Sequence, residues 1–208
     1  MAPTEFKNII FDLGGVIINI DPALSKAAFE ELGGSFSEQE LVLSDSLFRQ
    51  LEVGAIGPEQ FYSELQQFFD LPIPRAALQN AWNALLLDIP PERIKLLRKV
   101  QSRYRTFLLS NTNIIHMDQI NADLREVHGI THIDDLFEKA WLSYDMGLKK
   151  PDPTIFTAVL DAHGLNPAET LFIDDTQMHI DAAAGLGIQT LHITGGLTIN
   201  SWFEAQEA

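Results

Sequence analysis

The chain has 208 residues, contains no cysteine and carries a formal net charge of −15 at pH 7. The missing cysteines exclude disulfides, thiolate catalysis and cysteine-based zinc sites, and the acidic balance disfavours nucleic acid as a partner. No apolar run approaches the roughly 18–20 residues that span a bilayer, and the first residues lack the layout of a signal peptide, so we expect a cytoplasmic protein without membrane contact.

Short apolar stretches recur along the chain and alternate with helical patterns. The stretches predict five strands, over Phe6–Phe11, Thr106–Leu109, Ala140–Leu142, Thr170–Ile173 and Gln189–Ile193. Apolar residues at helical spacing predict helices over Pro91–Val100, Pro153–His163 and Ile180–Leu186. Strands that alternate with helices indicate βαβ units, and therefore an α/β fold with a parallel sheet.

The segment 22–88 breaks this alternation. It shows no strand pattern and predicts four helices, over Ala23–Leu32, Ser37–Leu47, Pro58–Phe69 and Pro74–Leu87. A crossover between two parallel strands needs only one helix, so we interpret the segment as a helical insert between the first two strands. A long but ordinary crossover is the alternative.

Polar residues directly follow four of the predicted strands. They are Asp12, Ser110-Asn111-Thr112, Lys149-Lys150-Pro151 and Asp174-Asp175. In an open parallel sheet, ligands bind outside the carboxyl ends of the strands, so these residues are expected to converge. Each alone is typical of a helix cap or a surface turn, and their joint position at strand ends is what indicates a site.

The chemistry of such a site follows from its charges. Asp12, Asp174 and Asp175 would repel one another without a cation, and hard oxygen ligands of this kind suit Mg²⁺. The Ser110 hydroxyl and the backbone N–H groups after it offer donors to a phosphate, and a lysine ammonium would neutralise charge on the transferred group. Asp12 would then attack phosphorus and form an aspartyl-phosphate that water hydrolyses.

Four motifs in this arrangement resemble those of the haloacid dehalogenase (HAD) superfamily. FDLGGV is similar to the first motif, LLSNTN to the second, GLKKPDP to the third and LFIDD to the fourth, and their order and spacing match over essentially the whole chain. The resemblance implies a Rossmann-like core, residues 1–20 and 89–208, with strand order 5-4-1-2-3. Residues 21–88 would form the small four-helix cap of the family, in which Gly54-Ala55-Ile56-Gly57 resembles the loop that reaches over the active site.

The resemblance also implies an activity and a metal site. Most members are Mg²⁺-dependent phosphatases with an aspartate nucleophile, so the expected substrate is a small-molecule phosphate ester. Carried over by position, Asp12 is both the nucleophile and a metal ligand, and Gly14 offers its backbone carbonyl to the metal. Asp175 is the more direct carboxylate ligand of the remaining pair, and Asp174 supports it.

The second and third motifs imply the phosphate contacts. Ser110, Asn111 and Lys150 are expected to bind the phosphoryl group, and Lys150 is also expected to be catalytic. Lys150 is preferred to Lys149 because it directly precedes Pro151, as in the family pattern.

Gly14 departs from the family pattern, because most of these phosphatases carry a second aspartate there as general acid and base. Its loss removes a contribution of about 10²–10⁴-fold. FDLGGV still resembles a subgroup that opens FDLG-N/G-V and includes sugar-phosphate phosphatases, among them enzymes that act on α-D-glucose 1-phosphate. We therefore hypothesise a preference for anomeric, acyl or aryl phosphates, whose leaving groups need less help from an acid.

Three further residues have open roles. Asp21, just before Pro22, is either a substitute acid or a turn or helix-cap residue. His116 either faces the site or lies on a helix surface. His179 stands where many relatives have Asn or Asp; this either weakens the hydrogen-bond support of the metal or of Lys150, or concerns an ordinary polar helix residue.

Two other functions stay open. A catalytically weak phosphate-ester binding protein would follow from the missing acid at Gly14. A metal-free 2-haloacid dehalogenase of the same superfamily is disfavoured, because Asp174 and Asp175 argue for a metal. The sequence leaves the physiological substrate and the oligomeric state open.

Overall fold

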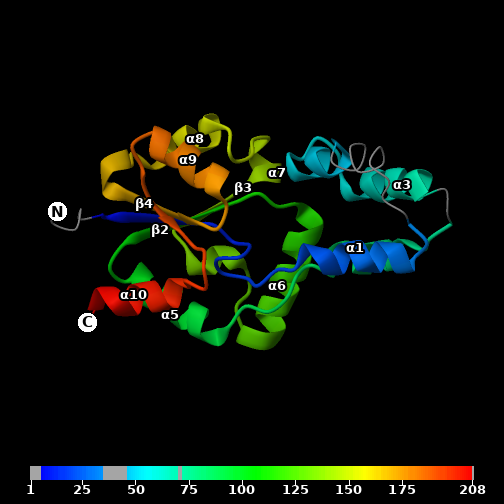
Figure 1. Cartoon of the computed structure of the whole chain (residues 1–208), viewed down its shortest axis with the longest axis horizontal. Coiled ribbons are helices and arrows are strands. Elements are labelled where there is room, and N and C mark those ends of the chain that lie inside the picture. Colours follow the sequence, from blue (N-terminus) through cyan, green and yellow to red (C-terminus); the bar gives the residue numbers. More distant parts are fainter. Residues whose placement is uncertain (1–5, 35–45, 70–71, 208) are drawn as a thin grey trace.

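A computed structural model describes residues 6–34, 46–69 and 72–207. Its centre is a parallel sheet of five strands, β1 (Asn8–Phe11), β2 (Arg105–Ser110), β3 (Lys139–Leu142), β4 (Thr170–Asp174) and β5 (Gln189–His192). The strand order β3-β2-β1-β4-β5 is the predicted order 5-4-1-2-3 counted from the opposite edge, so the predicted fold class is confirmed (Figure 1).

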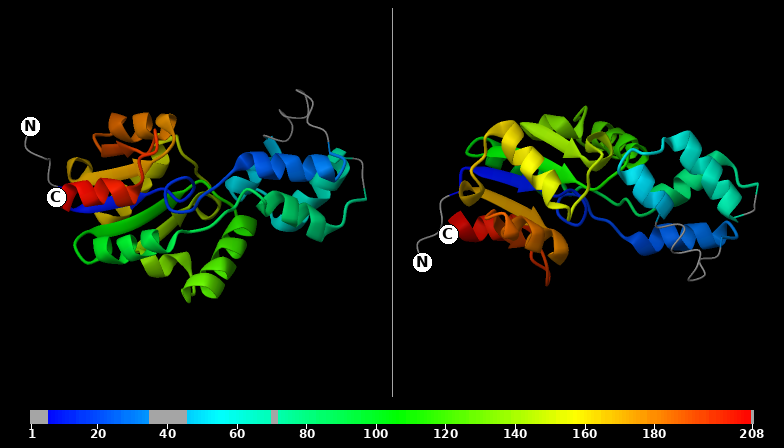
Figure 2. Two further views of the ribbon diagram at one scale, coloured as in Figure 1. Left: turned by 60° about the horizontal axis from the view of Figure 1, so that its bottom comes forward. Right: turned by 90° about the horizontal axis from the view of Figure 1, so that it is seen from above.

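Helices cover both faces of this sheet (Figures 1 and 2). One face carries α5 (Pro91–Gln101), α6 (Ile114–His128) and α10 (Ile199–Glu207). The other face carries α8 (Pro153–His163) and α9 (Gln177–Gly185). Shorter helical turns lie in the connections, namely η1 (Ile133–Leu136), α7 (Ser143–Met146) and η2 (Pro167–Glu169). Among the described residues, no helix combines the length and the apolar character that a membrane span needs.

Alternate residues of each strand enter different hydrophobic cores, because side chains in a strand point to opposite faces of the sheet. Ile9 and Phe11 pack in the core that includes α5, α6 and α10, whereas Ile10 packs in the core that includes α8 and α9. All three side chains are fully buried. Burial on both faces explains why the strands read as continuous apolar runs in the sequence.

The described residues of the helical insert, 21–34, 46–69 and 72–88, form a lobe beside the sheet (Figure 2). It contains α1 (Pro22–Glu31), a helical stretch over residues 46–52, α3 (Pro58–Phe69) and α4 (Arg75–Asn83). These helices bury a hydrophobic cluster, which includes Phe29, Leu51, Phe61 and Trp82 and is joined by Ile115 of α6. Most of its members come from the insert, which supports the proposed domain division at residues 20 and 88, and Ile115 connects the insert to the sheet domain. The predicted helix Ser37–Leu47 lies mostly outside the described residues.

The predicted helix Pro74–Leu87 is too long at its carboxyl end, because α4 ends at Asn83. The residues after Asn83 do not continue the helix. Their backbone instead pairs with the connection that leads from β1 into the insert. The Asp21 N–H donates to the Leu85 carbonyl over 2.9 Å, and the Leu87 N–H donates to the Asn19 carbonyl over 3.0 Å. The two connections between the sheet and the insert therefore run side by side as a short antiparallel pair.

Candidate active site

The register of the sheet places two of the predicted acids next to each other. Phe11 of β1 pairs with Ile173 of β4, so Asp12, directly after β1, and Asp174, the last residue of β4, lie side by side. Carboxylate oxygens of Asp12, Asp174 and Asp175 all lie within 4.8 Å of one another. The structure thus brings together the three acids that the sequence places at strand ends.

Lys150 enters this acidic cluster from the connection after β3. Its side chain is almost fully buried, with 1% exposed, and its Nζ donates to Asp12 Oδ1 and to Asp174 Oδ2, each over 2.7 Å. Burial alone would lower the pKa of Lys150, but the two carboxylates outweigh it and raise that pKa. Lys150 is therefore a fixed ammonium between two carboxylates.

The two buried acids respond differently to their surroundings. Burial raises the pKa of Asp12 to about 6, although the Lys150 ammonium acts to lower it. Burial also acts to raise the pKa of Asp174, but hydrogen bonding to His179 and the charge of Lys150 outweigh it, so that pKa is lowered. The two neighbouring acids therefore differ in the direction in which their surroundings shift the pKa, upward for Asp12 and downward for Asp174.

His179 and Thr176 hold Asp174 in place. His179 Nδ1 lies 3.0 Å from both carboxylate oxygens of Asp174, and the Thr176 N–H donates to Asp174 Oδ1 over 2.8 Å. With Lys150 as a third partner, both carboxylate oxygens of Asp174 are hydrogen-bonded to groups of the protein. This arrangement favours a supporting role for Asp174, and it gives His179 a contact inside the site instead of a purely exposed helix position.

The loop after β1 depends on two glycines that do different things. Gly15 has a φ of +69°, and a Cβ there would meet Asp175 Oδ2 at 2.1 Å, so only glycine lets Asp175 approach the loop. A Cβ at Gly14 would meet only the end of the Ile20 side chain, at 3.1 Å. The motif pattern pointed to Gly14, and the requirement for glycine at Gly15 was not predicted, although the Gly-Gly pair was the available signal.

The second motif lies on the other side of β1. Ser110 ends β2 and is buried. The Asn111 side chain donates to the Lys150 carbonyl over 2.9 Å and accepts from the Lys150 N–H over 2.8 Å. Both atoms of the Asn111 amide thus position the backbone of Lys150, so the predicted contact of Asn111 with phosphate would have to use its backbone.

Asp21 and His116, whose roles the sequence left open, make their contacts away from the acidic cluster. Asp21 is the N-cap of α1, where its Oδ1 accepts from the Ala23 N–H over 3.0 Å. His116 is buried in the first turn of α6, with its Nε2 3.2 Å from the Trp82 carbonyl and its Nδ1 3.0 Å from Asn113 Nδ2. Neither contact involves the acidic cluster. Asp21 therefore fits the helix-cap alternative, whereas the predicted surface position of His116 is wrong, because its side chain is buried.

A cleft of about 510 Å³ opens between the helical insert and residues 147–152, the segment that carries Lys150. Glu52 of the insert forms an ion pair there with Lys149. At the neighbouring Gly54, whose φ is +67°, a Cβ would meet the Tyr144 carbonyl oxygen at 2.2 Å. The predicted loop Gly54-Ala55-Ile56-Gly57 therefore touches the core beside the cleft.

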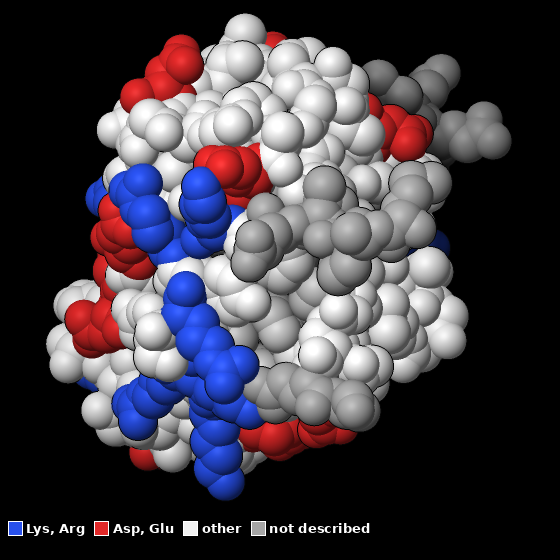
Figure 3. Space-filling view, turned by 90° about the vertical axis from the view of Figure 1, so that its left-hand side faces the viewer, with Lys and Arg blue, Asp and Glu red and all other residues white. Residues whose placement is uncertain are grey.

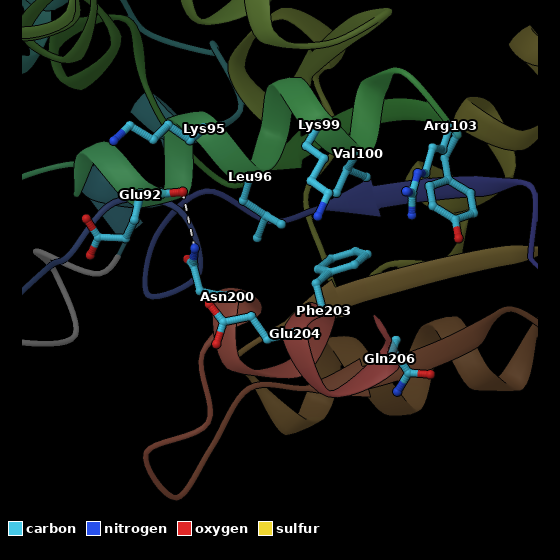
Figure 4. A pocket seen from close by; sticks show the side chains of 11 residues that line it. Glu92, Lys95, Leu96, Lys99, Val100, Arg103, Asn200, Phe203, Glu204 and Gln206 are labelled. Atoms are coloured by element: carbon cyan, nitrogen blue, oxygen red, sulfur yellow. Dashed lines mark hydrogen bonds between the residues drawn. The ribbon is translucent and has the colours of Figure 1, made fainter. Parts of the chain in front are cut away.

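A second hollow has a different character. Lys and Arg side chains gather on the side of the molecule opposite the helical insert (Figure 3). A groove of about 270 Å³ lies between α5 and α10, and its charged lining residues have both signs, namely Glu92, Lys95, Lys99, Arg103 and Glu204 (Figure 4). It contains none of the residues predicted for the reaction, so the cleft at Lys150 is the candidate active site.

Comparison with known proteins agrees with the motifs. Residues 6–187 match the sequence profile of the haloacid dehalogenase-like hydrolases. A D-ribitol-5-phosphate phosphatase of Bacteroides thetaiotaomicron is 29% identical over 192 residues, which are 91% of this chain and 93% of that protein. A sesquiterpene phosphatase of Aspergillus oryzae is 28% identical and covers 93% of each chain.

A solved structure shows the same likeness in three dimensions. A HAD family enzyme from Bacteroides thetaiotaomicron, crystallised as the wild-type protein with magnesium and inorganic phosphate, has a TM-score of 0.87 at 36% identity and covers 95% of this chain and 99% of that one. The profile match spans all four motifs. The sheet brings the first, third and fourth motifs together at Asp12, and the second motif contacts the third through Asn111. This chain therefore belongs to the haloacid dehalogenase-like hydrolases.

Proposed function

We propose that this chain is a Mg²⁺-dependent phosphatase of small phosphorylated sugars or polyols, and that it works through an aspartyl-phosphate on Asp12. The observation that carries the proposal is the Lys150 ammonium held between Asp12 and Asp174, with Asp175 beside them. The relatives support it, because one is named for ribitol 5-phosphate and another was crystallised with magnesium and phosphate.

The residues at the cluster fit Mg²⁺. They offer carboxylate oxygens from three acids, and Mg²⁺ prefers oxygen ligands, commonly one or two carboxylates together with substrate phosphate. Asp12 and Asp175 would hold the ion together with the Gly14 carbonyl, while Asp174 stays engaged with Lys150. When bound, the ion offsets the negative charge of the acids and of the phosphate, so that a dianionic ester can approach a carboxylate.

The residues of the chain then have distinct tasks. An Asp12 oxygen attacks phosphorus, the bond from phosphorus to the ester oxygen breaks, and its electron pair leaves with that oxygen. Lys150 and Ser110 stabilise the charge that spreads over the other phosphoryl oxygens. Because Gly14 supplies no acid, the departing oxygen takes its proton from water. Water then cleaves the aspartyl-phosphate, which restores Asp12 and releases phosphate.

The test uses p-nitrophenyl phosphate, whose leaving group needs little protonation. We expect the purified chain to hydrolyse it with Mg²⁺ and to lose that activity in excess EDTA. Asp12→Asn should lower kcat by at least about 10³-fold, because it removes the nucleophile. Asp181→Asn is the matched control; Asp181 lies on the exposed side of α9 and is bonded to Gln177, and its change should leave kcat within about twofold.

Two outcomes would favour the alternatives. Binding of phosphate esters without turnover, unaffected by Asp12→Asn, would indicate a binding protein. Halide release from 2-chloropropionate without added metal would indicate a dehalogenase. An aspartyl-phosphate on Asp12, found by mass spectrometry of acid-quenched enzyme during turnover, would distinguish the proposed route from direct attack of water.

A further inference from the structure

The cleft beside Lys150 has charged walls that the proposed chemistry does not use. Its residues come from the helical insert and from the segment around the third motif, and they include Phe48, Arg49, Glu52, Trp82, Lys149 and Asp152. Lys150 lies at the edge of the cleft, and its buried side chain contacts the nucleophile Asp12. Because the cleft adjoins this residue, the proposed function places the organic part of a phosphate ester bound at Asp12 in the cleft.

Glu52 is held in place from two directions. Its carboxylate pairs with Lys149, the residue next to Lys150. Its backbone carbonyl lies 2.6 Å from the hydroxyl of Ser143, a fully buried residue of the core. Glu52 thus belongs to the helical insert by sequence, but its position is fixed relative to the acidic cluster.

The ion pair still has hydrogen-bonding capacity toward the cleft. The side chains of Lys149 and Glu52 are 28% and 27% exposed, so neither is sealed from solvent. A carboxylate has about four lone-pair positions and an ammonium has three donors, so one contact between them leaves several positions for a ligand. Together the pair offers an acceptor beside a donor, which is what a hydroxyl group needs.

We infer that Glu52 and Lys149 recognise hydroxyl groups on the organic part of the substrate, so that the cleft selects phosphorylated polyols and open-chain sugars over alkyl phosphates. This inference rests on the proposed phosphatase function. A hydroxyl replaces the water that leaves the ion pair when the substrate binds, whereas an alkyl chain removes that water and returns no hydrogen bond. Sites that hydrogen-bond a substrate hydroxyl can reject the analogue that lacks it strongly, by factors of about 10⁴ or more when fully buried.

The experiment compares ribitol 5-phosphate with n-pentyl phosphate. Both are primary esters of five-carbon chains, so the hydroxyl groups are the main difference. The measured quantity is the ratio of their kcat/KM values with Mg²⁺. We expect a ratio of about 10² for the wild type, below the limit for a buried site because the pair is partly exposed.

Substitutions distinguish the effect of the ion pair on the ratio from the effect of other charged residues of the insert. Glu52→Gln and Lys149→Met should each lower the ratio at least tenfold through a higher KM for ribitol 5-phosphate. The double variant should add little, since the two residues act as one unit. Glu59→Gln is the control, because Glu59 also pairs with an arginine of the insert, Arg75, but is exposed and does not line the cleft; it should preserve the ratio.

Each failure has its own signature. If the wild type does not hydrolyse p-nitrophenyl phosphate, the proposed function fails. If it does, but Glu52→Gln keeps the ratio or lowers kcat/KM equally for both esters, this inference alone fails. Thermal unfolding of each variant shows whether it is folded, and a wild-type ratio below one would overturn the selection for hydroxyl groups directly.

Discussion

Lys150 brings one positive charge into a cluster with three carboxylates. Two unit charges 4 Å apart interact by about 4 kcal/mol at an effective dielectric constant of 20. A phosphate dianion that enters this cluster meets more repulsion from the acids than a single ammonium can offset. At the scale of single residues, the charge balance therefore requires a further cation, and it is the physical reason for assigning Mg²⁺ to this site.

Gly14 leads to a prediction about the leaving group. Without an acid at this position, esters with poor leaving groups should react slowly, so kcat/KM should be higher for α-D-glucose 1-phosphate than for glucose 6-phosphate. Gly14→Asp should raise kcat/KM for the 6-phosphate by about 10²-fold, because a positioned acid typically contributes 10²–10⁴-fold. The structure permits this change after a small shift of Ile20, since the new Cβ meets only that side chain, with its terminal methyl group at 3.1 Å.

Gly14→Ala is the control for that prediction, because it adds the Cβ without the carboxyl group. It should leave the ratio of the two esters as in the wild type. Equal kcat/KM values for the two glucose phosphates in the wild type, or a preference for the 6-phosphate, would contradict the hypothesis of a leaving-group bias.

At the scale of elements, the sequence predicts where the strands end. It does not predict which contacts the side chains make at those ends. Buried parallel strands leave continuous apolar runs, so the position of Asp12 after β1 follows from the sequence pattern. The pairing of the Asn111 amide with the Lys150 backbone spans 39 positions in the chain, and no local pattern encodes such a distance. Gly15 was missed for the same reason, because its partner is Asp175 on another strand end.

His116 is a buried, neutral side chain at the junction between α4 and α6. Its ring stacks on Trp82 of α4 at a centroid distance of 4.9 Å, and Nε2 faces the Trp82 carbonyl, so Nε2–H is the donor and Nδ1 accepts from Asn113. Burial lowers the pKa of His116 to about 4, although the bond to Trp82 acts to raise it. A protonated ring would place a second N–H against the Asn113 amide.

This junction predicts a loss of stability in mild acid. The unfolded histidine takes up a proton near pH 6.5, whereas the folded one does so near pH 4. The contribution of His116 is therefore complete above pH 6.5 and is lost as the pH falls toward 4, by up to about 3 kcal/mol. The free energy of unfolding from urea titrations should fall more steeply between these pH values in the wild type than in His116→Gln.

The control for this prediction is His132→Gln, which removes an exposed histidine. It should follow the wild-type curve, because its removal leaves the junction between α4 and α6 intact. A parallel fall in the His116→Gln variant would mean that other groups produce the acid sensitivity.

At the scale of the whole molecule, an overall charge of −15 coexists with basic residues at the site. Arg49, Lys149 and Lys150 line the cleft beside the acidic cluster, together with Glu52 and Asp152. Local potential steers a charged ligand more effectively than net charge does, so an acidic protein can still attract a phosphate. Composition alone could not reveal which charges line the cleft, because they come from distant parts of the chain. Glu52 and Lys149, for example, are 97 positions apart.

Gly54 tests whether the contact between the insert and the core matters for the whole molecule. Its φ is +67°, and a Cβ there would meet the Tyr144 carbonyl oxygen at 2.2 Å, whereas Gly57 in the same loop has open space around its Cβ position. Gly54→Ala should lower the free energy of unfolding by about 2 kcal/mol, since the left-handed backbone costs an L-residue roughly 1–2 kcal/mol and the clash adds to it. It should also raise KM for polyol phosphates, because the loop that moves away from Tyr144 carries Glu52 with it.

Gly57→Ala is the control, and it should change the free energy of unfolding by less than about 1 kcal/mol and leave KM as it is. Equal effects of the two substitutions, in thermal unfolding and in KM, would show that the close approach at Tyr144 does not position the insert.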